Sequence, residues 1–162
     1  MRILVFLHGT AIMHAAALGV GRAERVRQSR ERDVSVLDFA SYVPTDGAVE
    51  RLRSWERHGV EIAYLSSHQN TMDLAMDEAV LRSYGFPAGV IYRRDSGESY
   101  GQLAARLRPN LVIEDDCESI GGARQTVAVQ LARFGRSAPR CIVVPEFGGL
   151  AHLPDDPYAL RV

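Results

Sequence analysis

Lysine is absent from this sequence, and all 19 basic residues are arginine. They are balanced by 20 acidic residues, so the formal net charge is -1. This balance gives no argument for a nucleic-acid or anionic-membrane partner, and we expect neither. Every cationic task in the protein falls to a guanidinium group, whose planar fork suits a carboxylate or a phosphate.

Cysteine is scarce as well. The only two, Cys117 and Cys141, do not form a CxxC pair, so the sequence predicts no disulfide framework and a reducing, cytoplasmic location. Long apolar runs are also missing, and we expect no membrane-spanning helix. The apolar run at residues 1–7 is short and lacks a convincing signal-peptide cleavage site, so a buried first strand explains it better.

What the sequence does contain is an alternation of short apolar runs and helical patterns. Its length fits one domain, residues 1–162. Buried strands are expected at residues 2–7, 60–65, 89–92, 111–113 and 141–144. Helices are expected at residues 46–58, between Asn70 and Gly85, at 96–107 behind a Ser96 cap, and at 122–134 before Gly135. This alternation predicts a three-layer, Rossmann-like α/β fold with a parallel sheet.

Residues 11–43 interrupt the alternation between the first strand and the first helix. Within residues 22–33, five arginines against three acidic residues leave a local charge of +2, and residues 34–37 have the composition of a short extended piece. Two interpretations are open: a solvated surface, or a flap that closes over an anionic ligand. The core is therefore expected to be capless or to carry only this small flap.

Polar residues follow the apolar runs at four of the expected strand ends. They are His8-Gly9-Thr10, Ser66-Ser67-His68, Arg93-Arg94 and Glu114-Asp115-Asp116. Ligands of open parallel sheets bind beyond the carboxyl ends of the strands. The shared position of these hydroxyls, guanidiniums and carboxylates predicts a cleft for a charged ligand.

Taken in order, these strand ends resemble the motifs of the haloacid dehalogenase (HAD) superfamily over roughly residues 2–145. The first motif of that family is an apolar strand followed by Asp-x-Asp-Gly-Thr, and the matching stretch here is Phe6-Leu7-His8-Gly9-Thr10. The later motifs are matched by Ser66, by Arg94 or Arg93, and by Asp115 with Asp116; Tyr42-Val43-Pro44 resembles the family's approach to its first helix. The chain is most similar to a bacterial HAD-like group with a degenerate first motif.

The first motif departs from the family at both of its catalytic positions. In the family the leading aspartate attacks phosphorus and forms an aspartyl-phosphate. Phe6 stands at that position and cannot attack. The second aspartate is the general acid and base, and His8 stands there, which can still transfer protons near neutral pH. The resemblance implies a site that lacks aspartyl-phosphate chemistry and keeps His8 as its acid–base group.

The same resemblance implies a phosphate pocket and a metal site. The phosphate-facing residues would be Gly9, Thr10, Ser66, Ser67 and Arg94. The metal ligands would be Asp115 and Asp116. Because both first-motif carboxylates are lost, the outcomes that stay open are a divalent metal (Mg²⁺ or Mn²⁺, less favourably Zn²⁺) and no metal at all.

Each candidate also has a purely structural interpretation. Thr10 and Ser66 are suited to capping the next turn or helix, Arg94 to pairing with a surface acid, and Asp115-Asp116 to a helix N-terminus. His14 and His68 lack the spacing of a metal motif, and Gly121-Gly122 fits a plain turn. Asp38 is the weakest candidate, a substitute nucleophile without the Gly-Thr that should follow it.

Three functions stay in view. The first is a noncatalytic protein that binds a phosphorylated small molecule or a partner in the cleft. The second is a metal-dependent, phosphatase-type hydrolase with metal-bound water as nucleophile and His8 as acid–base group. The third is a structural subunit that uses residues 22–33 as an interaction arm. A homo-oligomer is compatible with all three.

Overall fold

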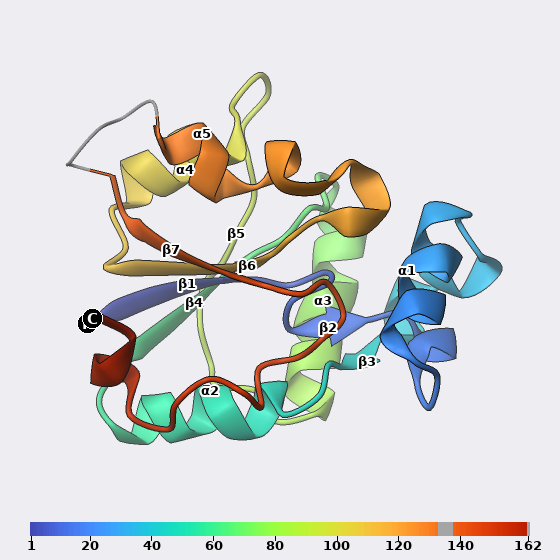
Figure 1. Cartoon of the computed structure of the whole chain (residues 1–162), viewed down its shortest axis with the longest axis horizontal. Helices are drawn as coiled ribbons and strands as arrows, with labels where there is room; N and C mark the ends of the chain where they lie inside the picture. Colours follow the sequence, from blue (N-terminus) through green and yellow to red (C-terminus); the bar gives the residue numbers. More distant parts are fainter. Residues whose placement is uncertain (133–137, 162) are drawn as a thin grey trace.

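Five parallel strands form the central sheet of the protein, in a computed structural model that describes residues 1–132 and 138–161 (Figure 1). The strand order is β5-β4-β1-β6-β7, and every neighbouring pair is parallel. The strands are β1 (Arg2–Phe6), β4 (Glu61–Leu65), β5 (Ile91–Tyr92), β6 (Leu111–Asp115) and β7 (Arg140–Val144). The predicted Rossmann-like α/β class is confirmed.

Helices cover both faces of the sheet. The helices α2 (Ala48–Arg57) and α3 (Thr71–Ser83) pack on one face, and α4 (Tyr100–Leu107) and α5 (Val127–Leu131) on the other (Figure 1). Along β1, Ile3 and Val5 belong to the first core cluster and Leu4 to the second. Because both faces are buried, β1 is apolar at consecutive positions rather than at alternate ones.

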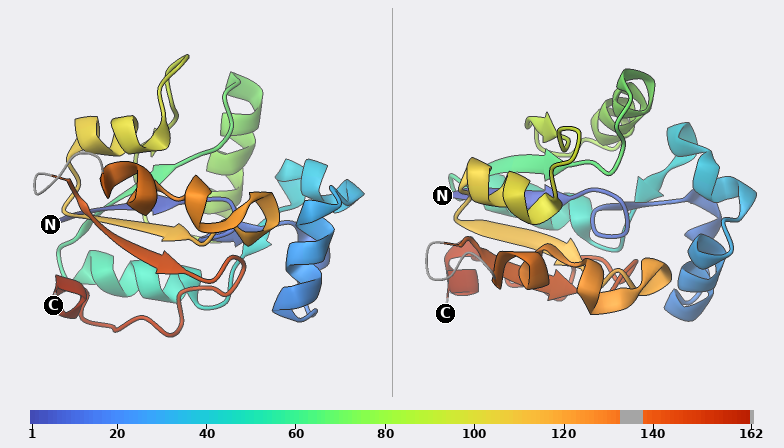
Figure 2. Two further views of the ribbon diagram at one scale, coloured as in Figure 1. Left: turned by 45° about the horizontal axis from the view of Figure 1, so that its top comes forward. Right: turned by 90° about the horizontal axis from the view of Figure 1, so that it is seen from above.

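Between β1 and α2 the chain leaves the core and returns. The short strands β2 (Ile12–Met13) and β3 (Val43–Pro44) pair antiparallel at the base of this excursion. Residues 14–42 between them, here called the insertion, hold α1 (Arg22–Arg30) and 3-10 turns at Ala15–Ala17, Val34–Leu37 and Phe39–Ser41. The insertion lies beyond the carboxyl ends of the sheet strands (Figure 2).

Residues 34–37 form a 3-10 turn, and the expectation of an extended piece was wrong. All four residues are at least partly exposed, so no buried sheet edge draws them into a strand. The Asp33 side chain instead accepts a hydrogen bond from the backbone N–H of Ser35, which starts the turn. A local side-chain bond has here overridden the β propensity of the two valines.

Ser99, not Ser96, caps α4. The Ser99 hydroxyl accepts from the Gln102 N–H at 3.2 Å, and the Gln102 side chain accepts from the Ser99 N–H at 2.8 Å. This is a full capping box, built with glutamine at the third helical position. The prediction placed the helix start three residues early because it considered only glutamate as the partner.

The helix expected at residues 122–134 is divided. A 3-10 turn covers Gly122–Gln125, and α5 starts only after Thr126, which is extended and caps the helix. Glu114 fixes that start, since its carboxylate accepts the N–H groups of Val127 and Ala128 at 2.6 and 2.7 Å. The predicted end at residue 134 and the Gly135 cap lie outside the described residues. None of the helices within residues 1–132 and 138–161 is long and apolar enough to cross a membrane.

Trp55 is the largest fully buried side chain of the core. It is 0% exposed, and its indole N–H donates to the carbonyl of Pro154 at 3.0 Å. The bond ties α2 to the C-terminal tail, whose last turn is Pro157–Arg161.

Replacing Trp55 with Ala should lower the free energy of unfolding by about 3–5 kcal/mol, because a large cavity opens and the tail loses its anchor. Urea denaturation measures the change. Arg57→Ala, at an exposed position of the same helix, is the control and should shift the value by less than about 0.5 kcal/mol. Equal effects of the two substitutions would contradict this account of the core.

Candidate functional site

A cavity of about 710 Å³ lies at the carboxyl edge of the sheet. Strand ends supply His8, Ser67 and Asp115 to its wall, and the insertion supplies Leu37 and Phe39. The cavity is thus enclosed jointly by the sheet edge and the insertion. This is the position at which open parallel sheets bind ligands.

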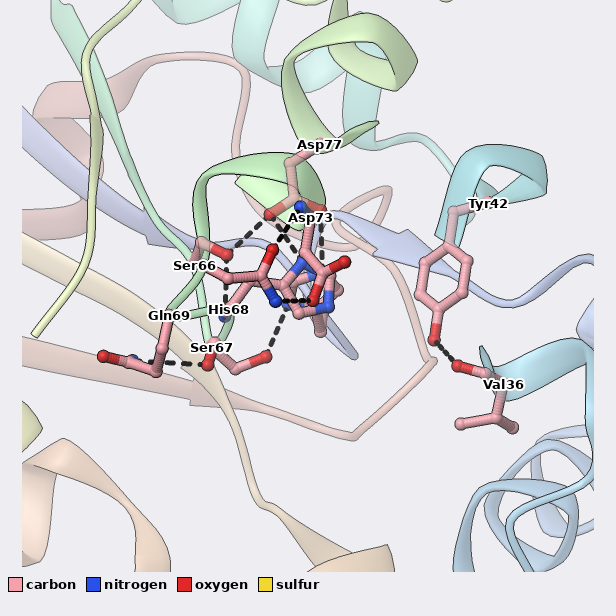
Figure 3. A network of polar contacts seen from close by, with 10 residues as sticks. Val36, Tyr42, Ser66, Ser67, His68, Gln69, Asp73 and Asp77 are labelled. Carbon is pink, nitrogen blue, oxygen red and sulfur yellow. Dashed lines mark hydrogen bonds and ion pairs between the residues drawn. The ribbon is translucent and has the colours of Figure 1, made fainter. Parts of the chain in front are cut away.

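A buried carboxylate, Asp77 on α3, organises one side of the cavity (Figure 3). Its Oδ1 lies 3.0 Å from His8 Nε2. Its Oδ2 lies 3.1 Å from His68 Nδ1 and accepts the Ser66 hydroxyl at 2.6 Å. The second nitrogen of His8, Nδ1, lies 2.8 Å from the Ser67 hydroxyl oxygen. We call these five residues the histidine cluster.

The charges of the histidine cluster are set by Asp77, which is 1% exposed. Burial alone would raise the pKa of Asp77, but hydrogen bonds from His68, His8 and Ser66 outweigh it and hold the pKa well below its usual range. Burial also opposes protonation of His68. The hydrogen bond to Asp77 and the charge of that carboxylate prevail, and the pKa of His68 is raised.

Three carboxylates, Asp115, Asp116 and Glu146, form an acidic cluster on the other side. An oxygen of each lies within 4.8 Å of an oxygen of the others. Burial raises the pKa of Asp115 and of Glu146, and the charge of Asp116 adds to both shifts. Asp115 is held by the Thr10 hydroxyl at 2.8 Å, and its carboxylate also accepts the Cys117 N–H at 2.9 Å.

The insertion is tied to the acidic cluster by arginine. Arg22 on α1 lies 3.1 Å from Asp116 and 2.7 Å from Glu118, and its Nε donates to the carbonyl of Glu146 at 2.9 Å. Arg25 is buried and donates to the carbonyl of Phe147 at 2.7 Å. These contacts fix residues 22–33 against the rest of the protein, which disfavours the prediction that they form a free interaction arm. Arg32, from the same segment, lines the cavity.

Phe6 and Tyr100 form an aromatic part of the cavity wall. Their rings meet edge to face with centroids 5.1 Å apart. The Arg94 guanidinium lies over the Tyr100 ring, 4.1 Å from its centroid. The position that the sequence resemblance assigns to the nucleophile is therefore occupied by a packed aromatic ring.

Gly9 separates the two clusters. Its φ is +86°, and a Cβ at this position would lie 2.8 Å from Asp115 Oδ2. Only glycine accommodates both the left-handed backbone and the approach of the carboxylate.

The structure brings some of the predicted site residues to the cavity and not others. His8, Gly9, Ser67, Arg94 and Asp115 line it. Thr10 and Ser66 are 0% exposed and do not reach the cavity. The Thr10 hydroxyl donates to Asp115, and the Ser66 hydroxyl donates to Asp77. Asp116 is engaged by Arg22. Asp38 lies at the junction of two 3-10 turns, and His14, which lines the cavity, binds Gln28 at 2.9 Å.

Asp77 and Glu146 are the main residues that sequence reasoning missed. Asp77 comes three residues after Leu74 and three before Val80, so it lies on the apolar side of the predicted helix. An acid on such a face was a usable signal, because buried charges are rare unless paired. Glu146 follows the last strand in a loop, where its sequence neighbours give no such signal.

Solved structures share this fold. The class C acid phosphatase from Bacillus anthracis with tungstate bound matches over 91% of this chain and 68% of its own, with 16% identity and a TM-score of 0.55. The HAD domain of the effector protein Lem4 from Legionella pneumophila matches over 99% and 92%, with 17% identity and a TM-score of 0.51. A scan against protein-family models and a search of curated proteins found no match.

A third structure is the D,D-heptose bisphosphate phosphatase from B. bronchiseptica, complexed with magnesium and phosphate. It matches over 99% of this chain and 98% of its own, with 13% identity and a TM-score of 0.50. The protein therefore has the HAD-like fold, as the order of its motifs predicted.

Replacing Asp77 with Asn should lower the free energy of unfolding by about 2–3 kcal/mol near pH 5, because three donors lose a buried charged acceptor. The raised pKa of His68 adds stability that is complete below its unfolded value of about 6.5 and is lost as pH rises through the folded value. The lowered pKa of Asp77 adds stability that is present above about 3.9 and is lost as pH falls.

The difference between wild type and Asp77→Asn is thus expected to be largest between about pH 4 and 6.5 and smaller at pH 9. Urea denaturation across this range measures it. The control is Glu78→Gln on the same helix, whose exposed pair with Arg82 should contribute less than about 0.5 kcal/mol at any pH. A difference that does not vary with pH would contradict the assigned charges.

Proposed function

We propose that this protein binds a phosphorylated small molecule in the cavity, without aspartyl-phosphate chemistry. The observation that carries the proposal is Phe6: its ring packs on Tyr100 at the nucleophile position, while Arg94 and Ser67 still line the cavity. Relatives in fold with tungstate bound, and with magnesium and phosphate bound, support a phosphate-related role for this edge of the sheet.

Arg94 is the residue best suited to hold the anion. Its Nε is buried and has no hydrogen-bond partner within residues 1–132 and 138–161. An unsatisfied buried donor costs roughly 1–3 kcal/mol, and a phosphate oxygen would satisfy it with a charge-assisted bond. Stacking on Tyr100 keeps the guanidinium in place beside the cavity.

The rest of the ligand would meet aromatic and apolar side chains. The cavity lining includes the rings of Phe39, Tyr42 and Tyr100 and the side chain of Leu37 from the insertion. Pockets with this lining favour a ligand that carries an apolar or aromatic group next to its polar one. An aromatic phosphomonoester is therefore a suitable probe.

A second candidate function is metal-dependent hydrolysis, and the acidic cluster is the observation that favours it. Three carboxylates fit a hard divalent cation such as Mg²⁺ or Mn²⁺ better than Zn²⁺. Asp115, Asp116 and Glu146 would hold the ion, whose charge would polarise a phosphate oxygen. His8, 3.0 Å from Asp77, would move the proton.

Phenyl phosphate should bind the wild-type protein, and Arg94→Met should weaken that binding by about 10- to 100-fold, because a charge-assisted hydrogen bond is lost. Isothermal titration calorimetry measures the affinity. The neighbouring Arg93, whose side chain donates to the carbonyl of Gln69 instead, gives the matched control Arg93→Met, which should bind as wild type does. Equal loss in both variants would refute the role of Arg94.

Phenyl phosphate should not be turned over in the presence of Mg²⁺, Mn²⁺ or Zn²⁺, because the nucleophile position is aromatic. Release of inorganic phosphate is the measurement. Turnover that Asp115→Asn abolishes and that Asp38→Asn leaves intact would instead establish the metal-dependent hydrolase.

A further inference from the structure

Ser67, His8 and Asp77 are joined in a line by two hydrogen bonds. The Ser67 hydroxyl oxygen lies 2.8 Å from His8 Nδ1, and His8 Nε2 lies 3.0 Å from Asp77 Oδ1. Neither contact follows from neighbouring sequence positions, since 59 residues separate Ser67 from His8 and 69 separate His8 from Asp77. The order hydroxyl, imidazole, buried carboxylate is the one by which proteins activate a serine.

The buried carboxylate decides which nitrogen of His8 carries the proton. Asp77 is an acceptor, so the nitrogen that faces it, Nε2, must be the donor. In the neutral ring Nδ1 is then the acceptor, and it is this nitrogen that faces the Ser67 hydroxyl. His8 is thereby poised to take the Ser67 proton.

Two adjacent serines have different environments at the end of β4. Ser66 is 0% exposed and donates directly to Asp77, so it belongs to the support of the histidine cluster. Ser67 is exposed and lines the cavity together with His8. Of the two hydroxyls, only that of Ser67 is both next to the imidazole and open to a ligand.

We propose that Ser67 is the nucleophile of an ester hydrolase site, with His8 as its general base and Asp77 as the residue that positions His8. This goes beyond phosphate binding and does not depend on it. The substrate class is a carboxylic ester with an apolar or aromatic group. A carbonyl ester is uncharged, and the wall near His8 is aromatic: the Tyr42 ring lies 5.7 Å from that of His8, and the Phe39 ring 4.2 Å from that of His68.

The reaction balances without a further reagent. Ser67 Oγ bonds to the carbonyl carbon as its proton moves to His8 Nδ1, and the ester C–O bond breaks as that proton passes to the leaving alcohol. Water then attacks the acyl-serine, gives its proton to His8, and the acid leaves as Ser67 Oγ recovers a proton. His68 binds the same carboxylate, its ring centroid lies 4.3 Å from that of His8, and it also lines the cavity, so a protonated His68 would stabilise an oxyanion formed next to it.

The test is covalent labelling of the full chain with diisopropyl fluorophosphate, located by peptide mass spectrometry. Ser67 should be modified in wild type, and His8→Gln should slow its labelling by about 100-fold or more, as expected for loss of a general base. Ser96, an exposed serine on a separate loop, is the internal reference and should stay unmodified. Circular dichroism of each variant establishes that it is folded.

Hydrolysis of p-nitrophenyl butyrate gives the second readout. The chain has no lysine, so side-chain amines contribute no background reaction. Ser67→Ala, a substitution at an exposed position, should lower turnover by about 100-fold or more, and Ser96→Ala should not change it.

The proposal is overturned if Ser67 is not labelled, if His8→Gln labels at the wild-type rate, or if Ser67→Ala keeps full esterase turnover. It is also overturned if EDTA abolishes labelling, because His8, His68 and Asp77 would then act as metal ligands rather than as a proton relay. Labelling of Ser67 requires no bound phosphate, so failure of phenyl phosphate binding and failure of this proposal are separate results.

Discussion

The hydrogen bonds that converge on Asp77 are the constraint on which the site depends. One buried carboxylate binds the ring of His8, two residues after β1, and the ring of His68 and the hydroxyl of Ser66, both in the loop that follows β4. A charge in the interior is tolerable only when such donors surround it. The charge of Asp77 also orients each donor, so that the side chains facing the cavity are held by hydrogen bonds from behind the cavity wall.

The insertion completes the cavity, and ion pairs and hydrogen bonds from its arginine side chains hold it against the core. Here the arginines come from the excursion and the acceptors from the core: Arg22 reaches Asp116 and Glu118, and Arg25 reaches the carbonyl of Phe147. Thr45, just after β3, adds bonds to the carbonyls of Thr10 and Ala11 and so closes the base of the excursion. Apolar contacts add to the polar ones, because Ala17 and Val26 of the insertion pack with Met13 and Phe147 in a small buried cluster.

The fold was largely predictable from local patterns, and the site only in part. Continuous apolar runs predicted the five strands because a sheet covered on both faces needs them, and strand ends predicted where polar residues would gather. The errors arose where a side chain acts on a distant or unexpected backbone group, as Glu114 does at the start of α5 and Gln102 at the start of α4. The pairing of His8 with Asp77 spans 69 residues and is determined by the tertiary fold, so the sequence did not predict it. The acidic residue on an apolar helix face indicated only that Asp77 would need a partner.

A single glycine divides this edge of the sheet into two halves of opposite character. On one side of Gly9, His8 turns to α3 and joins the histidine cluster; on the other, Thr10 turns to β6 and joins the acidic cluster. Because any side chain at Gly9 would collide with Asp115, the boundary must stay bare backbone. A ligand that spans the cavity therefore meets imidazole and hydroxyl groups on one side of Gly9 and carboxylates on the other, and this difference favours one orientation of an asymmetric molecule.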